Sequence, residues 1–176
     1  EVREAPSPFI LELRPFVAGR DYHSLMHAND AMRRDASFSD GIFRVRPYYG
    51  IPDIFINLPG ALFHASPEWY FNFEYPIEKD RGFDCHEDLF CHGTFTVTLD
   101  KGLSFAVIVS TDDPSGRDAF DLFEGEQRRR RKLLETRAAR DDFSTTLTLA
   151  ADQFVVRRGK DLRTIIAGYH WFTDWG

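Results

Sequence analysis

The sequence has only two cysteines, no long apolar run and no excess of positive charge. Cys85 and Cys91 are too few for the disulfide framework of a small secreted domain. No apolar stretch approaches the roughly 20 residues that a membrane helix needs, and no signal peptide is recognisable. The net charge of −6 argues against nucleic acid as the main partner, since binding to phosphates requires a basic face. We therefore expect a cytoplasmic protein that binds neither membrane nor nucleic acid.

Aromatic residues, in contrast, are abundant: they make up 15% of the chain, and 17 of them are phenylalanines. They are densest in residues 43–90, where Asp53 to Leu58, Ala61 to Ala65 and Glu68 to Tyr75 are three short strand candidates. Proline and glycine separate these candidates, because proline lacks a backbone donor and glycine tolerates the positive φ of turns. Tight turns between short strands predict an antiparallel meander.

A hairpin and two helices are predicted after this stretch. Residues 94–100 alternate polar and apolar side chains, Lys101-Gly102 forms the turn, and Leu103 to Val109 returns as the second strand. Residues 117–142 are rich in helix-forming residues and contain no strand pattern. Ser144 or Thr145 is the candidate cap of a second helix. The predicted fold class is mainly β, an antiparallel β-sandwich followed by one or two C-terminal helices.

Several motifs, in chain order, resemble those of bacterial glycogen debranching enzymes of the amylo-α-1,6-glucosidase type. The closing segments resemble the entrance to the catalytic domain of that family, and the earlier segments resemble its N-terminal domain. The first group comprises residues 150–157 and 166–176, and the second comprises residues 13–16, 20–25, 46–47, 69–75 and 81–90.

The resemblance implies a supersandwich-like N-terminal domain, an (α/α)6 catalytic barrel, and hydrolysis of the α-1,6-linked glucose at glycogen branch points by two carboxylates. On this basis residues 1–116 form the β-sandwich, residues 117–142 form a linker helix, and residues 143–176 lead into a barrel that is absent. The predicted function is that of a non-catalytic fragment, inactive alone, which braces the barrel and borders the glucan site. A stand-alone carbohydrate-binding β-sandwich module is the alternative.

The implied partners are the catalytic domain of the same chain and, through the parent enzyme, glycogen or a branched maltooligosaccharide. The resemblance also implies that the opening strands of the domain family are missing here, so we expect that unpaired strand edges would allow self-association. No cofactor is expected.

Inverting glycoside hydrolysis needs two carboxyl groups about 6.5–9.5 Å apart. The carboxylate candidates are the pairs Glu87-Asp88 and Asp112-Asp113, and Asp174. Both pairs consist of sequence neighbours in turn-like contexts, which indicates solvated loops or caps, so no catalytic residue is predicted. Asp174 lies within a resembling motif and is assigned instead to sugar binding or to support of the strand-to-helix entry.

Aromatic planes stack on the apolar faces of glucose rings, and this property defines the substrate-binding candidates. The candidates are Trp69, Tyr70, Trp171 and Trp175, together with Asp174. Tyr75 is a further aromatic candidate and follows Trp69 and Tyr70 in the central meander. Core packing is the competing interpretation for each aromatic residue.

Two Cys-His dipeptides, Cys85-His86 and Cys91-His92, offer the ligand types of a zinc site. Because adjacent cysteine and histidine rarely reach one ion, the sequence favours ordinary thiols, and no metal is predicted. His23 and His27 would share a face if their segment were helical, but buried hydrogen bonding is the simpler interpretation. The basic run from Arg128 to Lys132 is flanked by glutamates, which indicates an exposed, salt-bridged helix face.

Overall fold

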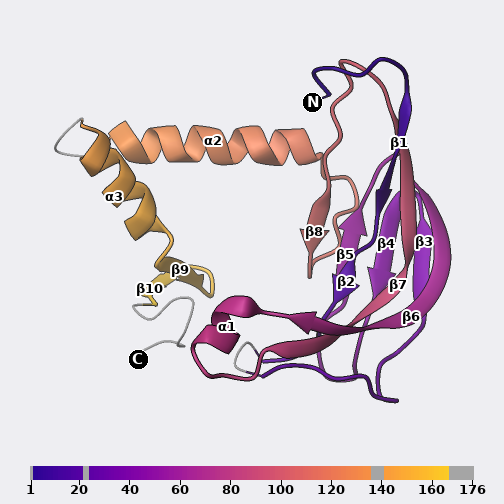
Figure 1. The fold of residues 1–176 in the computed structure, drawn as a ribbon. Helices are drawn as coiled ribbons and strands as arrows, with labels where there is room; N and C mark the ends of the chain where they lie inside the picture. The colour runs from indigo at the N-terminus through magenta and orange to yellow at the C-terminus, as the bar shows by residue number, and fades with distance from the viewer. Residues whose placement is uncertain (1, 22–23, 136–140, 167–176) are drawn as a thin grey trace. The chain divides into compact units, whose positions relative to one another are not determined.

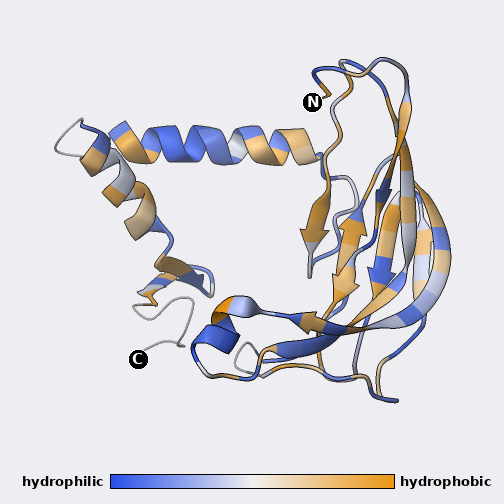
Figure 2. Ribbon diagram, in the orientation of Figure 1, coloured by the Kyte–Doolittle hydropathy of each residue, from blue (hydrophilic) through white to orange (hydrophobic). Residues whose placement is uncertain are grey.

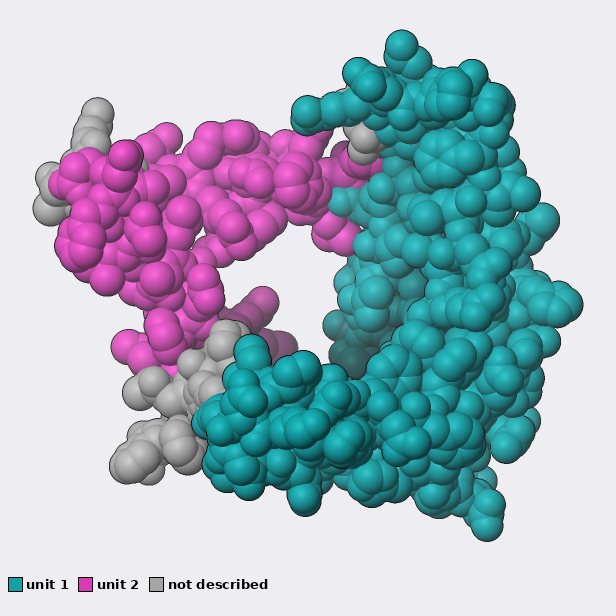
Figure 3. Space-filling model, in the orientation of Figure 1, with its two compact units in different colours: residues 1–119 teal, residues 120–176 magenta. Residues whose placement is uncertain are grey.

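The computed structural model describes residues 2–21, 24–135 and 141–166. The chain divides into two compact units, Glu1–Ala119 and Phe120–Gly176 (Figure 3). Antiparallel strands dominate the first unit and helices the second, which confirms the predicted mainly-β class followed by helices (Figure 1). The three finer segments, residues 1–116, 117–142 and 143–176, remain a prediction.

The first sheet of unit 1 is built around the 14-residue strand β7 (His86–Leu99). Strands β1 (Phe9–Leu13) and β2 (Phe16–Val17) pair with successive parts of one edge of β7. Strand β6 (Leu62–Glu74) pairs along the other edge, because Thr96 faces both Glu12 of β1 and Leu62 of β6. All three pairings are antiparallel, so β7 is fully hydrogen-bonded where β1 and β6 overlap.

The second sheet has the order β3-β4-β5-β8, and all of its neighbours are antiparallel. Its strands are β3 (Ala36–Ser39), β4 (Ile42–Val45), β5 (Ile54–Asn57) and β8 (Ile108–Ser110). Side chains alternate on β4, where Phe43 and Val45 are buried while Arg44 is exposed and bonds to Asp53.

The core lies between the two sheets. Phe43, Val45 and Ile56 from the second sheet form one buried cluster with Phe95, Val97 and Leu99 from β7. The rings of Phe43 and Phe95 meet edge to face with centroids 5.3 Å apart. Hydrophobic residues along β4, β5 and β7 appear in orange in Figure 2. Burying each such side chain contributes about 1.5–3 kcal/mol, so this cluster joins the sheets into a sandwich.

The central meander differs from the sequence prediction in its number of strands. The two candidates Ala61 to Ala65 and Glu68 to Tyr75 form one strand, β6, and the register shifts between Ala65 and Glu68. Pro67 lies in that irregularity, where proline is tolerated because no ladder donor is required. The short helix α1 (Pro76–Asp80) then connects β6 to β7.

The predicted hairpin of residues 94–100 and 103–109 is wrong. Residues 94–99 belong to β7, whose edges are already occupied by β1 and β6. Leu103 instead accepts a hydrogen bond from the backbone N–H of Val2, and the chain continues to β8, which pairs with β5. A strand with both edges occupied cannot accept a third neighbour, so the returning segment joins the other sheet.

Unit 2 contains most of helix α2 (Ala119–Glu135), helix α3 (Asp142–Asp152) and a hairpin of β9 (Val155–Arg158) and β10 (Leu162–Ile165). The cap of α3 is Asp141, whose side chain accepts from the N–H of Ser144 at 2.6 Å, and not Ser144 or Thr145 as expected. A carboxylate at that position also favours the positive helix N-terminus.

The basic run of α2 is confirmed as a salt-bridged face. Arg128 pairs with Glu124, while Arg129 and Arg130 both pair with Glu126. In the described residues, no helix is long and apolar enough to cross a membrane.

Candidate functional site

A hollow of about 510 Å³ opens beside β6, within the range that small-molecule sites occupy. Trp69 of β6 forms one wall, and the segment that precedes β3 forms the rest. The other lining residues are Ala28, Asn29, Asp30, Met32 and Arg34. The hollow therefore combines one indole plane with an amide, a carboxylate and a guanidinium.

Packing beneath the hollow fixes the position of Trp69. The indole meets the buried ring of Phe90 edge to face, with centroids 5.2 Å apart, and Met26 and Met32 complete this second core cluster. Phe90 faces inward from β7, directly opposite Trp69 in the sheet register. One side of the indole is thus anchored, while the residue as a whole remains partly exposed.

Local hydrogen bonds hold two of the polar residues of the hollow, Asn29 and Arg34. The guanidinium of Arg34 donates to the carbonyl of Pro67 at 3.2 Å and lies 5.7 Å from the Phe90 ring centroid. The side-chain amide of Asn29 donates to the hydroxyl of Tyr48 at 2.9 Å. These contacts pre-organise two hydrogen-bonding groups beside the aromatic wall.

The buried carboxylate of Glu87 anchors the segment that carries the hollow. Its side chain is only 1% exposed and forms a two-pronged ion pair with the guanidinium of Arg20. The hydroxyl of Tyr75 donates to Oε2 at 2.5 Å, and the N–H of Met26 donates to Oε1 at 3.1 Å. The expectation of a solvated loop or cap is therefore wrong for Glu87, because it points inward from β7 to satisfy these donors.

The protonation of Glu87 reflects two opposing causes. Burial by itself raises the pKa of Glu87, but the hydrogen bonds from Arg20, Tyr75 and Met26 outweigh burial and lower the pKa below its ordinary value. A carboxylate that is ionised and fully used by four donors supports structure and is not available as a general acid.

Asp88, the next residue, secures the same segment and also contacts β6. Its side chain accepts from the N–H of Ala28 at 3.0 Å and from the N–H of Asn72 at 2.9 Å. These two backbone bonds lower the pKa of Asp88, with His27 nearby as a smaller contribution. Glu87 and Asp88 therefore point to different partners and do not form a catalytic pair.

The other carboxylate pair forms a surface turn, as the sequence indicated. Asp113 accepts from the N–H of Ser115 at 2.9 Å, and Asp112 donates its N–H to the hydroxyl of Ser110. Both aspartates are exposed, which is the solvated-loop arrangement expected of a turn.

The remaining described aromatic candidates do not line the Trp69 hollow. Tyr70 alternates with Trp69 on β6 and lies against Phe16, with ring centroids 4.9 Å apart. Its hydroxyl donates to Glu68, so Tyr70 belongs to a different surface from the hollow. Tyr75 takes part in the Glu87 network. Trp171, Asp174 and Trp175 lie outside the described residues.

The two Cys-His dipeptides do not form one common cluster. The buried thiol of Cys91 donates to the carbonyl of Gly93 at 3.2 Å, and Nε2 of His92 lies 3.0 Å from the carbonyl oxygen of Arg33. Burial lowers the pKa of His92, which keeps the imidazole neutral. Cys85 directly precedes β7 and His86 is its first residue, and both cysteines are free thiols.

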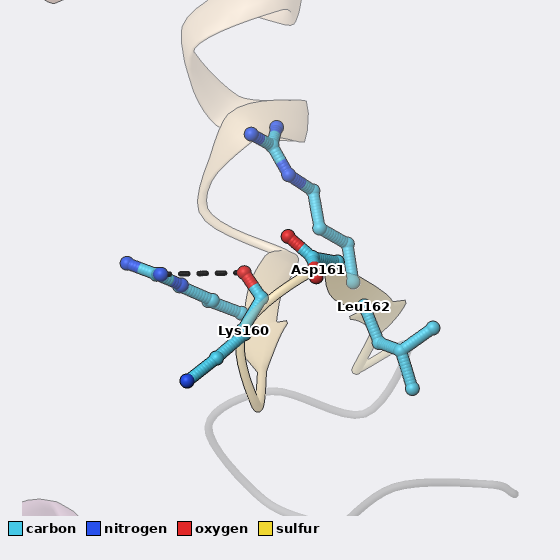
Figure 4. A pocket seen from close by; sticks show the side chains of 5 residues that line it. Lys160, Asp161 and Leu162 are labelled. Atoms are coloured by element: carbon cyan, nitrogen blue, oxygen red, sulfur yellow. Dashed lines mark hydrogen bonds between the residues drawn. The ribbon is translucent and has the colours of Figure 1, made fainter.

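A second hollow, of about 290 Å³, lies in the β9–β10 hairpin (Figure 4). Its lining residues are Arg157, Lys160, Asp161, Leu162 and Arg163, and Arg157 donates to the carbonyl of Lys160 at 3.3 Å. This lining is mostly basic and has no aromatic plane, so it lacks the stacking surface that the Trp69 hollow provides.

Two family models match the chain. The model described as glycogen debranching enzyme N terminal matches residues 1–106, and the model described as amylo-alpha-1,6-glucosidase matches residues 149–176. No curated protein and no solved structure matches the chain at the threshold of significance. The first match spans more than half of the chain and includes β6, β7, the Trp69 hollow and the Glu87 network.

Proposed function

The chain belongs to the glycogen debranching enzyme family, and on that premise we propose that it braces a helical catalytic domain and borders its glucan site. The two matches, in chain order, fit a non-catalytic fragment of a debranching enzyme. The proposed parent reaction is hydrolysis of α-1,6-linked glucose at glycogen branch points. We also propose a cytoplasmic location, with which the two free thiols are compatible.

The exposed apolar surface of unit 2 supports the bracing role. Neither α2 nor α3 has a buried residue among those described. Large hydrophobic side chains are exposed on both helices and on the hairpin, namely Phe120, Leu122, Phe123, Phe143, Leu147, Val155, Leu162 and Ile165. Exposed apolar surface of this kind favours a covering partner, and residues 149–176 match the amylo-alpha-1,6-glucosidase family. The proposed cover is the catalytic domain of the same chain.

The Trp69 hollow is the single observation that supports contact with glucan. A glucose ring presents an apolar face to an indole and hydroxyl groups to hydrogen-bonding side chains. Asn29, Asp30 and Arg34 supply such side chains around Trp69. The proposed ligand is a glycogen chain or a branched maltooligosaccharide.

The first experiment measures glucose release from a branched limit dextrin by the purified chain. No release is expected, because the carboxylates of Glu87 and Asp88 are occupied by structural donors. Release by the chain alone would overturn the proposed non-catalytic role.

The second experiment titrates the chain with maltoheptaose by calorimetry. Binding that weakens at least about fivefold in Trp69→Leu and in Arg34→Met, but not in Tyr70→Phe, supports the hollow as a glucan site. Tyr70→Phe is the matched control, since Tyr70 packs against Phe16 on a different surface. Equal affinity in all variants would exclude the hollow.

The same titration addresses the alternative, a stand-alone carbohydrate-binding module. Binding by this chain alone favours the module, whereas its absence favours a bracing role only. Self-association is a further proposal, because the edge strand β8 exposes Val109 and pairs only with β5 among the described strands. Light scattering at increasing concentration tests it, and a constant monomer mass would exclude it.

A further inference from the structure

Three side chains with metal-binding atoms meet at the end of the β6–β7 pair that α1 connects. Glu74 is the last residue of β6, His86 is the first residue of β7, and Cys85 precedes it. Glu74 and His86 face each other directly in the sheet register. One ligand atom from each of the three residues lies within 4.8 Å of the others.

The distances between the candidate ligand atoms approach those between neighbouring ligands of a tetrahedral metal ion. Cys85 Sγ lies 3.4 Å from Nδ1 of His86, whereas the 4.0 Å contact of Glu74 Oε1 is to the other ring nitrogen, Nε2. Since an imidazole binds one ion through one nitrogen, the relevant limit is that one ligand atom from each residue lies within 4.8 Å of the others. Bond lengths of about 2.3 Å to sulfur and 2.0–2.1 Å to nitrogen or oxygen place neighbouring zinc ligands about 3.3–3.6 Å apart. Side-chain rotations must bring the three ligand atoms closer, and the side chains of Glu74 and His86 are 41% and 52% exposed, which leaves them free of surrounding core packing.

The backbone around the cluster is held before any ion binds. The N–H of Tyr75 donates to the carbonyl of Cys85 at 2.8 Å, next to the Glu74–His86 pair. The side chain of Tyr75 is fixed in turn by the buried Glu87. Helix α1 closes the connection between the two strands (Figure 1). A site on paired strands needs less ordering on binding than a site on a loop.

We propose that Glu74, Cys85 and His86 bind a zinc-type divalent transition-metal ion. A thiolate and an imidazole favour zinc over magnesium or calcium, which prefer oxygen ligands. Three protein ligands leave one coordination position for water or for a group from a partner. This inference is independent of glucan binding.

Lys79 of α1 competes with the ion. Its ammonium lies 2.5 Å from Oε1 of Glu74, and the hydrogen bond between them lowers the pKa of Glu74. Metal binding through Oε1 of Glu74 must displace this ammonium, because one carboxylate oxygen cannot bind a metal ion and an ammonium from the same direction. Removing Lys79 is therefore expected to strengthen binding.

The sequence pointed away from this site for a reason that the structure removes. The sequence interpretation was that adjacent cysteine and histidine rarely reach one ion. Cys85 lies just before β7 begins, and its Sγ turns toward the His86 ring. The third ligand comes from the facing strand and not from Cys91-His92, whose polar atoms contact the carbonyls of Gly93 and Arg33.

Cobalt(II) titration of the reduced, untagged chain tests the proposal, with cobalt as a coloured substitute for zinc. A thiolate-to-cobalt charge-transfer band is expected, together with tetrahedral d–d bands that added zinc removes. Cys85→Ser is expected to abolish the charge-transfer band. Glu74→Gln and His86→Gln are expected to weaken binding by at least about tenfold, as loss of a metal contact does.

Two further variants control the interpretation. Cys91→Ala removes the other thiol of the chain and should leave the band unchanged. Lys79→Met keeps all three ligands and should tighten binding, so it reports on the site even if a ligand variant fails to fold. No charge-transfer band in the parent chain, a band that survives Cys85→Ser, or unaltered binding in Lys79→Met would overturn the proposal.

Discussion

Replacing the buried carboxylate of Glu87 by the amide of glutamine is expected to destabilise the chain by about 2–3 kcal/mol. The carboxylate accepts two hydrogen bonds from Arg20, one from Tyr75 and one from the N–H of Met26. Glutamine has about the same volume as glutamate but only one acceptor oxygen. Its NH2 group would replace the other carboxylate oxygen, so the donors that bonded to that oxygen would lose their acceptor. The expected cost is below the 3–5 kcal/mol of a fully buried pair, because the side chain of Arg20 is 25% exposed and recovers water.

The same substitution predicts a pH dependence with a definite sign. The folded pKa of Glu87 is lowered from the ordinary value of 4.5, so near that pH the unfolded chain binds more protons than the folded chain. The stabilising contribution is present above pH 4.5 and is lost as the pH falls through the lower folded value. The difference in stability between the parent chain and Glu87→Gln should therefore shrink on acidification.

Urea denaturation followed by circular dichroism and tryptophan fluorescence measures both effects. Glu68→Gln is the matched control, since Glu68 is an exposed carboxylate of β6 and should change stability by no more than about 0.5 kcal/mol. Glu87→Gln with the same stability as the control would refute the anchoring role. A difference that grows as the pH is lowered would refute the linkage argument.

Three other substitutions test separate parts of the fold. In Gly93→Ala, the new Cβ would lie 2.3 Å from the carbonyl oxygen of His64, so urea denaturation should show a loss of at least about 2 kcal/mol, and parental stability would contradict this strand pairing. Asp141→Ala removes the N-cap of α3 and should cost about 1 kcal/mol, seen as earlier thermal loss of helical circular dichroism, whereas an unchanged transition would exclude this cap. Glu126, whose pKa is lowered to about 2 by hydrogen bonds from two arginines, should titrate at higher pH in Arg129→Gln by NMR, and an identical titration would show that the pair is not formed in solution.

The strand pattern of the fold was predictable where local sequence decides it. Asp53 to Leu58 was expected as a strand and contains β5, since its apolar run packs into the core. The partner of residues 94–100 was not predictable, because the edge of β7 is occupied by β1, far earlier in the chain. Gly93 lies within β7, where its missing Cβ admits the carbonyl of His64. Local patterns identify strands, whereas competition for strand edges decides how they pair.

Local sequence also did not determine which side chains meet at the candidate sites. Trp69 was predicted from its residue type, but Arg34 and Asn29 join it only through the path of the segment before β3. No local pattern marks Glu87, because Arg20 is 67 positions away in the sequence.

The dipeptide Glu87-Asp88 connects the two proposed sites physically. Both carboxylates accept from the segment before β3, Glu87 from the N–H of Met26 and Asp88 from the N–H of Ala28. Glu87 holds Tyr75, which follows the proposed metal ligand Glu74, and Asp88 holds the N–H of Ala28, which precedes Asn29 of the hollow. Both carboxylates are stabilised in the charged form by the donors that they position. Acidic residues in a member of this family invite a catalytic interpretation, but Glu87 and Asp88 hold the side chain and the backbone that lie next to the two proposed sites.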